Sequence, residues 1–154
     1  MTEFSGGNWL YLDDLQIGQR FTSRAYIVDE EQIKAFARQF DPQPFHVDNE
    51  AAKNSLFLGL AASGWHTASI TMRLLVEGGL PLAGGVIGTG GEFDWPTPTR
   101  PGDMLQVESE ILDVRPSRSK LDRGVVTVRS LTHNQRNEVV QRLTAKLIVP
   151  VALK

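Results

Sequence analysis

The chain has 154 residues, of which 41% are hydrophobic and 22% charged, and its formal net charge is −2. These values are typical of one folded domain, so we expect a single domain over residues 1–154 and exclude disordered and collagen-like classes. A weakly acidic chain argues against nucleic-acid binding, which depends on neutralising phosphates. No apolar run approaches the roughly 20 residues of a bilayer span, so no membrane partner is expected.

The sequence contains no cysteine, which excludes disulfides, thiolate nucleophiles and cysteine-type zinc sites. Its first residues include acidic side chains and lack the basic and then apolar pattern of an export signal. The expected location is therefore the cytoplasm.

Residues 1–28 form a polar lead-in that ends in a predicted half-buried strand, where Phe21, Ser23, Ala25 and Ile27 alternate with polar neighbours.

A helical pattern follows. Asp29 and Gln32 have the spacing of a capping box, and the apolar residues Ile33, Phe36, Ala37 and Phe40 then share one face. Pro42 and Pro44 end this helix and predict a rigid loop after it.

Two more helices are expected before residue 80. A short one covers residues 49–55. A longer one runs from residues 63–64 to Gly78–Gly79, with Ala61, Trp65, Ala68, Met72 and Leu75 on one face. Further apolar residues on its other faces predict that it is buried nearly all round.

The hydrophobic period then changes to two, which predicts strands over residues 86–95, 105–114, 125–131 and 139–149. Residues 134–137 form a polar turn between the last two strands, which indicates an antiparallel hairpin. Helices followed by long strands define an α+β fold in which one curved antiparallel sheet wraps the apolar helix. Such a sheet leaves edges exposed, so a homodimer is expected.

Asp41 and His46 are the first candidate site residues, in the stretch FDPQPFHVD. A carboxylate and a histidine are the groups that general acid–base chemistry needs near pH 7, and the prolines give their loop a preset geometry. The spacing alone leaves a second interpretation open, in which Asp41 caps a turn and His46 satisfies a buried polar contact. Asp48 fits the N-cap of the short helix.

The second candidate is the start of the long helix at Ser63 and Gly64, where unpaired N–H groups and the positive end of the helix dipole meet. This arrangement favours an oxyanion site, and it fits equally a Ser63 cap with close packing at Gly64. His66 fits a packed core histidine. A metal site drawn from His46, Asp48 and His66 lacks any known ligand motif, so no metal is expected.

Other polar features are weaker. His133 falls beside a turn and is expected to be solvated. The segment GGVIGTGGE forms a strand and does not open a helix, so it is no dinucleotide fingerprint. The basic residues Arg115, Arg118, Lys120 and Arg123 form either a solvated turn or a contact for the phosphates of a thioester carrier.

The stretch FARQFDPQPFHVDNEAAKNSLFLGLAASGWHTAS resembles the MaoC-like dehydratase and (R)-specific enoyl-CoA hydratase family, with Asp41, Pro44, His46, Asp48 and Gly64 in the order and spacing of its motif. Phe93, Pro96 and the PGD at residues 101–103 extend the resemblance. It implies a dimeric hot-dog fold and reversible hydration of a trans-2-enoyl-CoA to an (R)-3-hydroxyacyl-CoA, without a cofactor. Asp41 and His46 would activate water, and Gly64, with Ser63 beside it, would bind the thioester oxygen.

The chain departs from the family motif at Gln43, where asparagine is usual, at Phe40, where a small residue is common, and at Trp65, where methionine is common. These side chains are candidates for the substrate pocket and leave the acyl-chain preference open. Two rival functions remain: a hot-dog acyl-CoA thioesterase, and a non-catalytic module that binds acyl thioesters. The paired histidine argues against the thioesterase.

Overall fold

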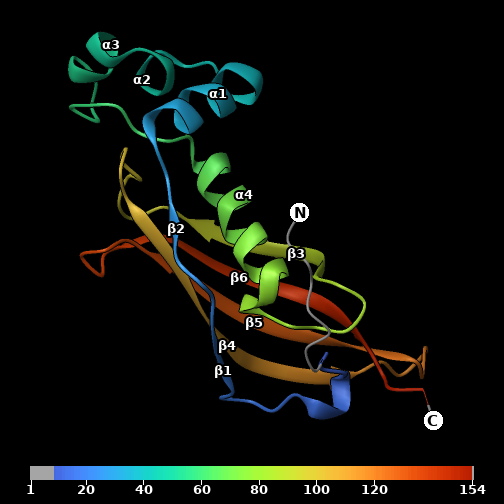
Figure 1. Cartoon of the computed structure of the whole chain (residues 1–154). Coiled ribbons are helices and arrows are strands. Elements are labelled where there is room, and N and C mark those ends of the chain that lie inside the picture. Colours follow the sequence, from blue (N-terminus) through green and yellow to red (C-terminus); the bar gives the residue numbers. More distant parts are fainter. Residues whose placement is uncertain (1–8, 154) are drawn as a thin grey trace.

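The computed structural model describes residues 9–153 and shows an antiparallel sheet curved around one helix, α4 (Gly64–Leu74), as predicted (Figure 1). The sheet order is β1-β4-β5-β6-β3, and β2 also pairs with β4. The strands are β1 (Arg20–Thr22), β2 (Tyr26–Ile27), β3 (Ile87–Asp94), β4 (Met104–Pro116), β5 (Arg123–His133) and β6 (Val139–Pro150). This is the α+β, hot-dog architecture.

The long strands follow the predicted period of two. In β5, every second residue from Gly124 to Thr132 is buried, whereas the residues between them are only half-buried. The predicted turn after β5 is confirmed, with Asn137 N–H donating to the Asn134 carbonyl at 3.0 Å. One continuous apolar core fills the space between the sheet and α4.

The start of α4 is confirmed, and the helix continues to Gly79 as the π-helical turn η2 (Leu75–Gly79). The prediction that this helix is buried nearly all round is wrong, because Trp65 is 57% exposed and Met72 is also exposed. The buried face instead carries two threonines. The hydroxyl of Thr67 pairs with that of Thr99 at 2.9 Å, and Thr71 pairs with Thr132 at 2.6 Å. These pairs satisfy polar groups that would otherwise be costly to bury.

Small helices gather at the N-terminal end of α4 (Figure 1). They are α1 (Glu30–Phe40), α2 (Pro44–Val47) and α3 (Asn49–Lys53), while η1 (Leu12–Asp14) lies in the lead-in. The expected loop after Pro42 is wrong in part, because Pro44 begins α2. Proline suits this first helical position, where its missing N–H has no helical acceptor. Phe40 was expected on the apolar face of α1 but is 65% exposed, since it is the last residue of the helix.

The lead-in also differs from prediction. The expected strand is broken between β1 and β2 at Ser23, whose hydroxyl accepts a hydrogen bond from Val107 N–H at 2.9 Å. Asp29 caps α1 by accepting from Gln32 N–H, but the capping box is incomplete. The Gln32 side-chain N–H donates to the Asp29 carboxylate, so the Gln32 side chain does not bond to the Asp29 backbone. The Gln32 side-chain oxygen accepts a hydrogen bond from the Tyr26 hydroxyl.

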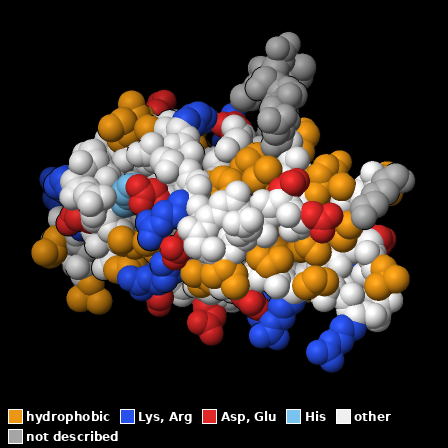
Figure 2. All heavy atoms as spheres, turned by 90° about the horizontal axis from the view of Figure 1, so that it is seen from below, with side chains coloured by type: hydrophobic (Ala, Val, Ile, Leu, Met, Phe, Trp, Pro, Cys, Tyr) orange, Lys and Arg blue, Asp and Glu red, His pale blue; other side chains and the backbone are white. Residues whose placement is uncertain are grey.

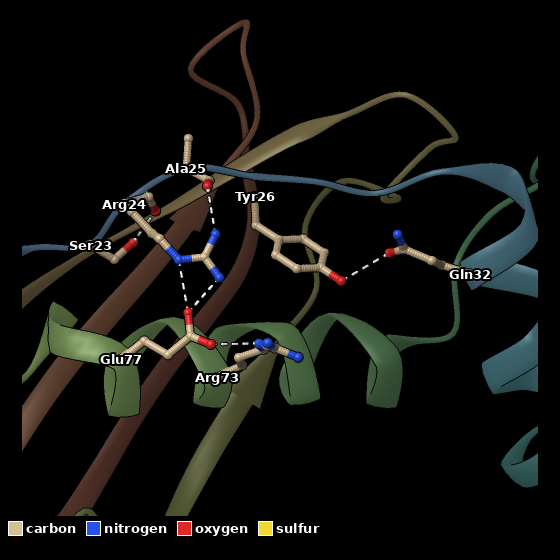
Figure 3. A network of polar contacts seen from close by, with 7 residues as sticks. All are labelled: Ser23, Arg24, Ala25, Tyr26, Gln32, Arg73 and Glu77. Carbon is tan, nitrogen blue, oxygen red and sulfur yellow. Dashed lines mark hydrogen bonds and ion pairs between the residues drawn. The ribbon is translucent and has the colours of Figure 1, made fainter. Parts of the chain in front are cut away.

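The end of α4 is tied to the segment before α1 through Glu77 (Figure 3). The Glu77 carboxylate accepts hydrogen bonds from Arg24 on one side and from Arg73 on the other, the latter at 2.6 Å. Arg24 also lies over the Tyr26 ring, 5.6 Å from its centroid. The hydrogen bond from Arg24 holds the pKa of Glu77 below its ordinary value, with Arg73 adding to this effect although burial opposes it.

On the face that Figure 2 shows, Lys and Arg side chains alternate with Asp and Glu, in keeping with the small net charge of −2. Within residues 9–153, no helix has the length and apolar character needed to cross a membrane.

We expect Glu77→Gln to lower the free energy of unfolding by at most about 1 kcal/mol at pH 7, because both arginines can return to water. Folding lowers the pKa of Glu77. The ionised Glu77 side chain therefore stabilises the fold fully at pH values above its ordinary pKa of 4.5, and this stabilisation is lost as the pH falls through its pKa in the folded protein. Urea unfolding at pH 7 and at lower pH should therefore show the difference from wild type shrinking with acidification. Asp13→Asn, at an exposed position on η1, is the control, and an equal effect of both substitutions would contradict the prediction.

Candidate active site

Asp41 and His46 lie together beside the N-terminus of α4. Asp41 is the C-cap of α1, and His46 is on the single turn α2, so the two intervening prolines turn the chain back. His46 Nε2 is 3.4 Å from Asp41 Oδ2. Two atoms at this separation can both reach one water molecule at normal hydrogen-bonding distance. The geometry therefore meets the requirement for a shared water.

The tautomer of His46 is set by the backbone. The ring is buried, and its Nδ1 lies 2.6 Å from the carbonyl oxygen of Ala61. Because a carbonyl can only accept, Nδ1 carries the proton and donates it. In the neutral ring, Nε2 is then unprotonated and faces Asp41, which leaves it able to accept a proton.

Asp41 is held as a carboxylate. Burial raises its pKa, but hydrogen bonds from Ser63 and Gln43 and the electrostatic effect of the nearby His46 ring outweigh burial, so the pKa lies below its ordinary value. Ser63 Oγ donates to Oδ2 at 2.6 Å, and Gln43 Nε2 donates to Oδ1 at 2.6 Å. The longer side chain of Gln43 thus reaches the carboxylate directly.

Ser63 differs from its predicted role beside the substrate. It is fully buried, and its hydroxyl accepts from Trp65 N–H at 3.2 Å while donating to Asp41. Ser63 therefore caps α4 and holds the carboxylate at the same time. The cap was one of the two roles expected for Ser63, and the hydrogen bond to Asp41 adds to it.

Gly64 is the first residue of α4, and among the described residues its N–H makes no hydrogen bond. A Cβ on Gly64 would lie 2.8 Å from the indole of Trp95, so the site leaves no room for a larger residue without moving that ring. An unpaired N–H at the positive end of a helix is suited to bind an oxygen that gains negative charge.

These groups open into one pocket of ≈ 600 Å³. Asp41, Gln43, His46 and Gly64 line it, and Trp65 contributes as predicted. Phe40 was proposed for the pocket but is not among its lining residues; its ring packs against Phe36 instead. The rest of the lining is mainly apolar, with three threonines among it: Phe45, Leu56, Phe57, Ala62, Thr67, Trp95, Pro96, Thr97, Pro98, Thr99 and Val140.

The remaining candidates have other roles. Asp48 is the N-cap of α3, as predicted, accepting from Glu50 N–H at 2.9 Å. His66 packs in the core as predicted, stacked on Phe36 at 4.7 Å, and burial lowers its pKa to about 4. His133 was expected to be solvated but is half-buried, with its Nδ1 3.1 Å from the Gln106 carbonyl. Within residues 9–153, no cluster of His, Asp and Glu side chains has the makings of a metal site.

The basic cluster lies in the hairpin between β4 and β5, at the opposite end of the sheet from the helices around the pocket (Figure 1). Arg115 pairs with Asp113 at 2.7 Å and Arg123 pairs with Asp122 at 2.9 Å. Both ion pairs reduce the positive charge available to phosphates.

Trp95 and Thr99 are site residues that the sequence did not single out. Trp95 packs against Gly64, and its indole N–H donates to Gln141 Oε1 at 3.0 Å. Thr99 accepts a hydrogen bond at its carbonyl from Ala62 N–H at 2.9 Å, next to the start of α4. The proline-rich PTPTRPG stretch is the sequence signal that could have pointed to these two residues. Its prolines favour an extended backbone, and this backbone lies beside the pocket.

A hot-dog sheet that places Asp41 and His46 beside an unpaired helix N-terminus is the arrangement expected of a protein of the hydratase and dehydratase kind. A model of the MaoC like domain matches residues 14–134, and the chain belongs to this family.

Three relatives illustrate the likeness. A MaoC-like dehydratase from Rhodospirillum rubrum is 61% identical, with a TM-score of 0.93, covering 94% of this chain and 99% of that one. The uncharacterized protein YdeM of Bacillus subtilis is 39% identical over 81% of this chain and 88% of its own. The (R)-hydratase PhaJ1 of Pseudomonas aeruginosa has a TM-score of 0.73 at 24% identity, covering 92% of this chain and 86% of that one, which shows a common fold.

We expect Gln43→Leu to raise the pKa of Asp41, because the substitution removes a hydrogen bond that stabilises the carboxylate. NMR titration of the Asp41 side-chain carboxyl carbon measures this shift. Ser63→Ala should move the pKa in the same direction. Gln39→Leu, an exposed position on α1, is the matched control and should leave Asp41 unchanged. A pKa that stays in place, or falls, in Gln43→Leu would refute the assignment.

Proposed function

We propose that the protein adds water reversibly to a trans-2-enoyl-CoA to give an (R)-3-hydroxyacyl-CoA. The observation that carries the proposal is the 3.4 Å approach of His46 Nε2 to the Asp41 carboxylate, beside the unpaired N–H of Gly64. The largely apolar pocket around these groups suits the acyl and thioester parts of such a substrate.

The reaction needs a base for water and an anchor for the developing enolate. Water held between Asp41 and His46 gives a proton to Nε2 as its oxygen bonds to C3 of the enoyl group. Electrons move to the thioester oxygen, which the Gly64 N–H stabilises. The enolate then takes a proton from the pair at C2, restoring the neutral ring. Both new bonds form on one face of the double bond, because one side-chain pair supplies both.

The (R) configuration of the product and CoA as the carrier are the most specific parts of this proposal. The (R) configuration is supported by the likeness in fold to proteins described as (R)-hydratases from Pseudomonas aeruginosa and A. caviae, at 24% and 22% identity. Chiral analysis of the product tests the first, and parallel assays with acyl carrier protein thioesters test the second.

Incubation with crotonyl-CoA should lower the absorbance of the conjugated enoyl thioester in the wild type. Asp41→Asn and His46→Ala should each reduce kcat by at least about 10²-fold, since general acid–base catalysis is worth that much. Asp113→Asn, in the distant β4–β5 hairpin, is the control and should keep full activity.

The rival functions give different results in the same assay. Release of free thiol without hydration would identify a thioesterase. Neither signal across several chain lengths would leave a non-catalytic binding module and exclude the hydratase.

We also propose that the protein is a homodimer joined along β3. Every residue of β3 is exposed, and β3 is the last strand in the sheet order, so its outer backbone groups have no strand beside them. Ile87 on this strand is exposed, and exposed Met72 on α4 lines an apolar pocket of ≈ 260 Å³ to which β3 also contributes. A second copy paired along this edge would cover both.

Sedimentation equilibrium should give twice the chain mass of 17.0 kDa for the wild type. The double variant Ile87→Lys/Met72→Lys should shift the equilibrium to monomer, because it introduces charges into the proposed interface. Ile27→Lys, at an exposed position on β2, is the control and should remain dimeric. A monomeric wild type, or a double variant as dimeric as the control, would rule out this interface.

A further inference from the structure

The segment from Phe57 to Ala61, between α3 and α4, has no regular secondary structure yet makes two contacts with His46. The Ala61 carbonyl accepts the proton of His46 Nδ1 at 2.6 Å. The Phe57 ring lies 6.0 Å from the His46 ring and 5.0 Å from that of Phe45, which itself meets His46 edge-on. The position and tautomer of His46 therefore depend on where this segment lies.

The segment packs into the core at its C-terminal end, where Leu60 and Ala61 are buried, but its first half does not. Leu56, just before it, and Leu58 are 102% and 80% exposed, so neither anchors it in the core. Leu58 also has a φ of 57°, a left-handed conformation that is unfavourable for a residue with a branched side chain. Contacts from elsewhere in the chain must supply the restraint.

Arg100 supplies that restraint. Its guanidinium donates from Nη1 to the Gly59 carbonyl at 2.9 Å and to the Leu60 carbonyl at 3.3 Å, and from Nη2 to the Phe57 carbonyl. One planar group thus gathers three backbone carbonyls of the segment. Lysine could not reproduce this fork of donors, because its ammonium is a single point.

Arg100 is itself fixed to the sheet. Its backbone N–H donates at 2.8 Å to the carboxylate of Asp103, which is buried at the entry to β4. The adjoining Gly102 N–H bonds to the Val28 carbonyl, and Gly102 has the positive φ of 87° that this turn requires. The guanidinium therefore projects from a rigid base onto a segment that needs support.

We propose that Arg100 is a positioning residue for His46, which it holds in the Nδ1–H tautomer through the carbonyls of residues 57–60 and the Ala61 carbonyl that follows. When this clamp is lost, the place of the Ala61 carbonyl depends on the bonds of Ala61 N–H to the Phe45 carbonyl and of Ala62 N–H to the Thr99 carbonyl. The bond from Nδ1 to the Ala61 carbonyl then weakens, so the proton no longer resides on Nδ1 alone and Nε2 is no longer always the base. The consequence for turnover rests on the proposed hydratase function, whereas the tautomer of His46 does not.

Long-range ¹H–¹⁵N NMR of the His46 ring reports the tautomer directly. In the wild type the ¹⁵N chemical shifts of the two ring nitrogens should be widely separated, because Nδ1 is protonated and Nε2 is not. In Arg100→Met the two chemical shifts should move toward each other, because both tautomers become populated. In the crotonyl-CoA assay the same variant should lose about 10- to 100-fold in kcat, with KM within about threefold, as expected for a misplaced catalytic group.

Arg129→Met is the matched control, because Arg129 bonds to Glu110 on the sheet, away from His46, and should change neither readout. Arg100→Lys keeps the charge and should give intermediate ring shifts and faster amide exchange over residues 58–62. It also serves as the test if Arg100→Met does not fold.

Three results would overturn the proposal. The first is an Nε2–H tautomer in the wild type, and the second is a folded Arg100→Met whose ring ¹⁵N chemical shifts equal those of the wild type. The third is an Arg100→Lys variant that matches the wild type in both ring chemical shifts and amide exchange. Absence of hydration by the wild type would instead refute the proposed function and leave the NMR test intact.

Discussion

The burial of α4 against the concave face of the sheet is the constraint on which the rest of the structure depends. Two hydroxyl pairs, Thr67 with Thr99 and Thr71 with Thr132, join the helix to the segment before β4 and to β5. Hydrogen bonds are directional, whereas apolar contacts tolerate sliding, so these pairs fix the helix along its axis and around it. The N-terminus of α4 is thereby held at one place, where α1, α2 and the pocket meet it.

Ser63 connects that helix to the charge in the site. The same hydroxyl caps α4 and donates to Asp41, so the start of the helix and the ionisation of the carboxylate are coupled. Gln43 completes the arrangement from the other side. The longer side chain at this position, a departure from the family motif, therefore keeps a direct bond to the carboxylate.

Much of the fold was predictable because its signals are local. The period of two in residues 125–131 and 139–149 is visible in the sequence. Ser63 and Gly64 mark the start of α4, and Gly79 ends its continuation η2. The spacing and the two prolines left the pairing of Asp41 with His46 open, and the resemblance to the family motif predicted it. The orientation of α4 was not predictable, since its buried threonines look like surface residues until Thr99 and Thr132 are placed opposite them. Trp95 and Arg100 escaped notice for the same reason: their partners lie more than thirty positions earlier in the chain.

The indole rings around the pocket have an optical consequence. The chain has three tryptophans, and two of them, Trp65 and Trp95, line the pocket and contact each other edge-on at 5.5 Å. Trp95 is further held by its bond to Gln141 and by contact with Gly64, where the thioester oxygen is proposed to bind. Indole fluorescence depends on the polarity and rigidity of its surroundings. The molecule therefore carries its own reporter, so that entry of a ligand can be followed by emission without attaching a dye.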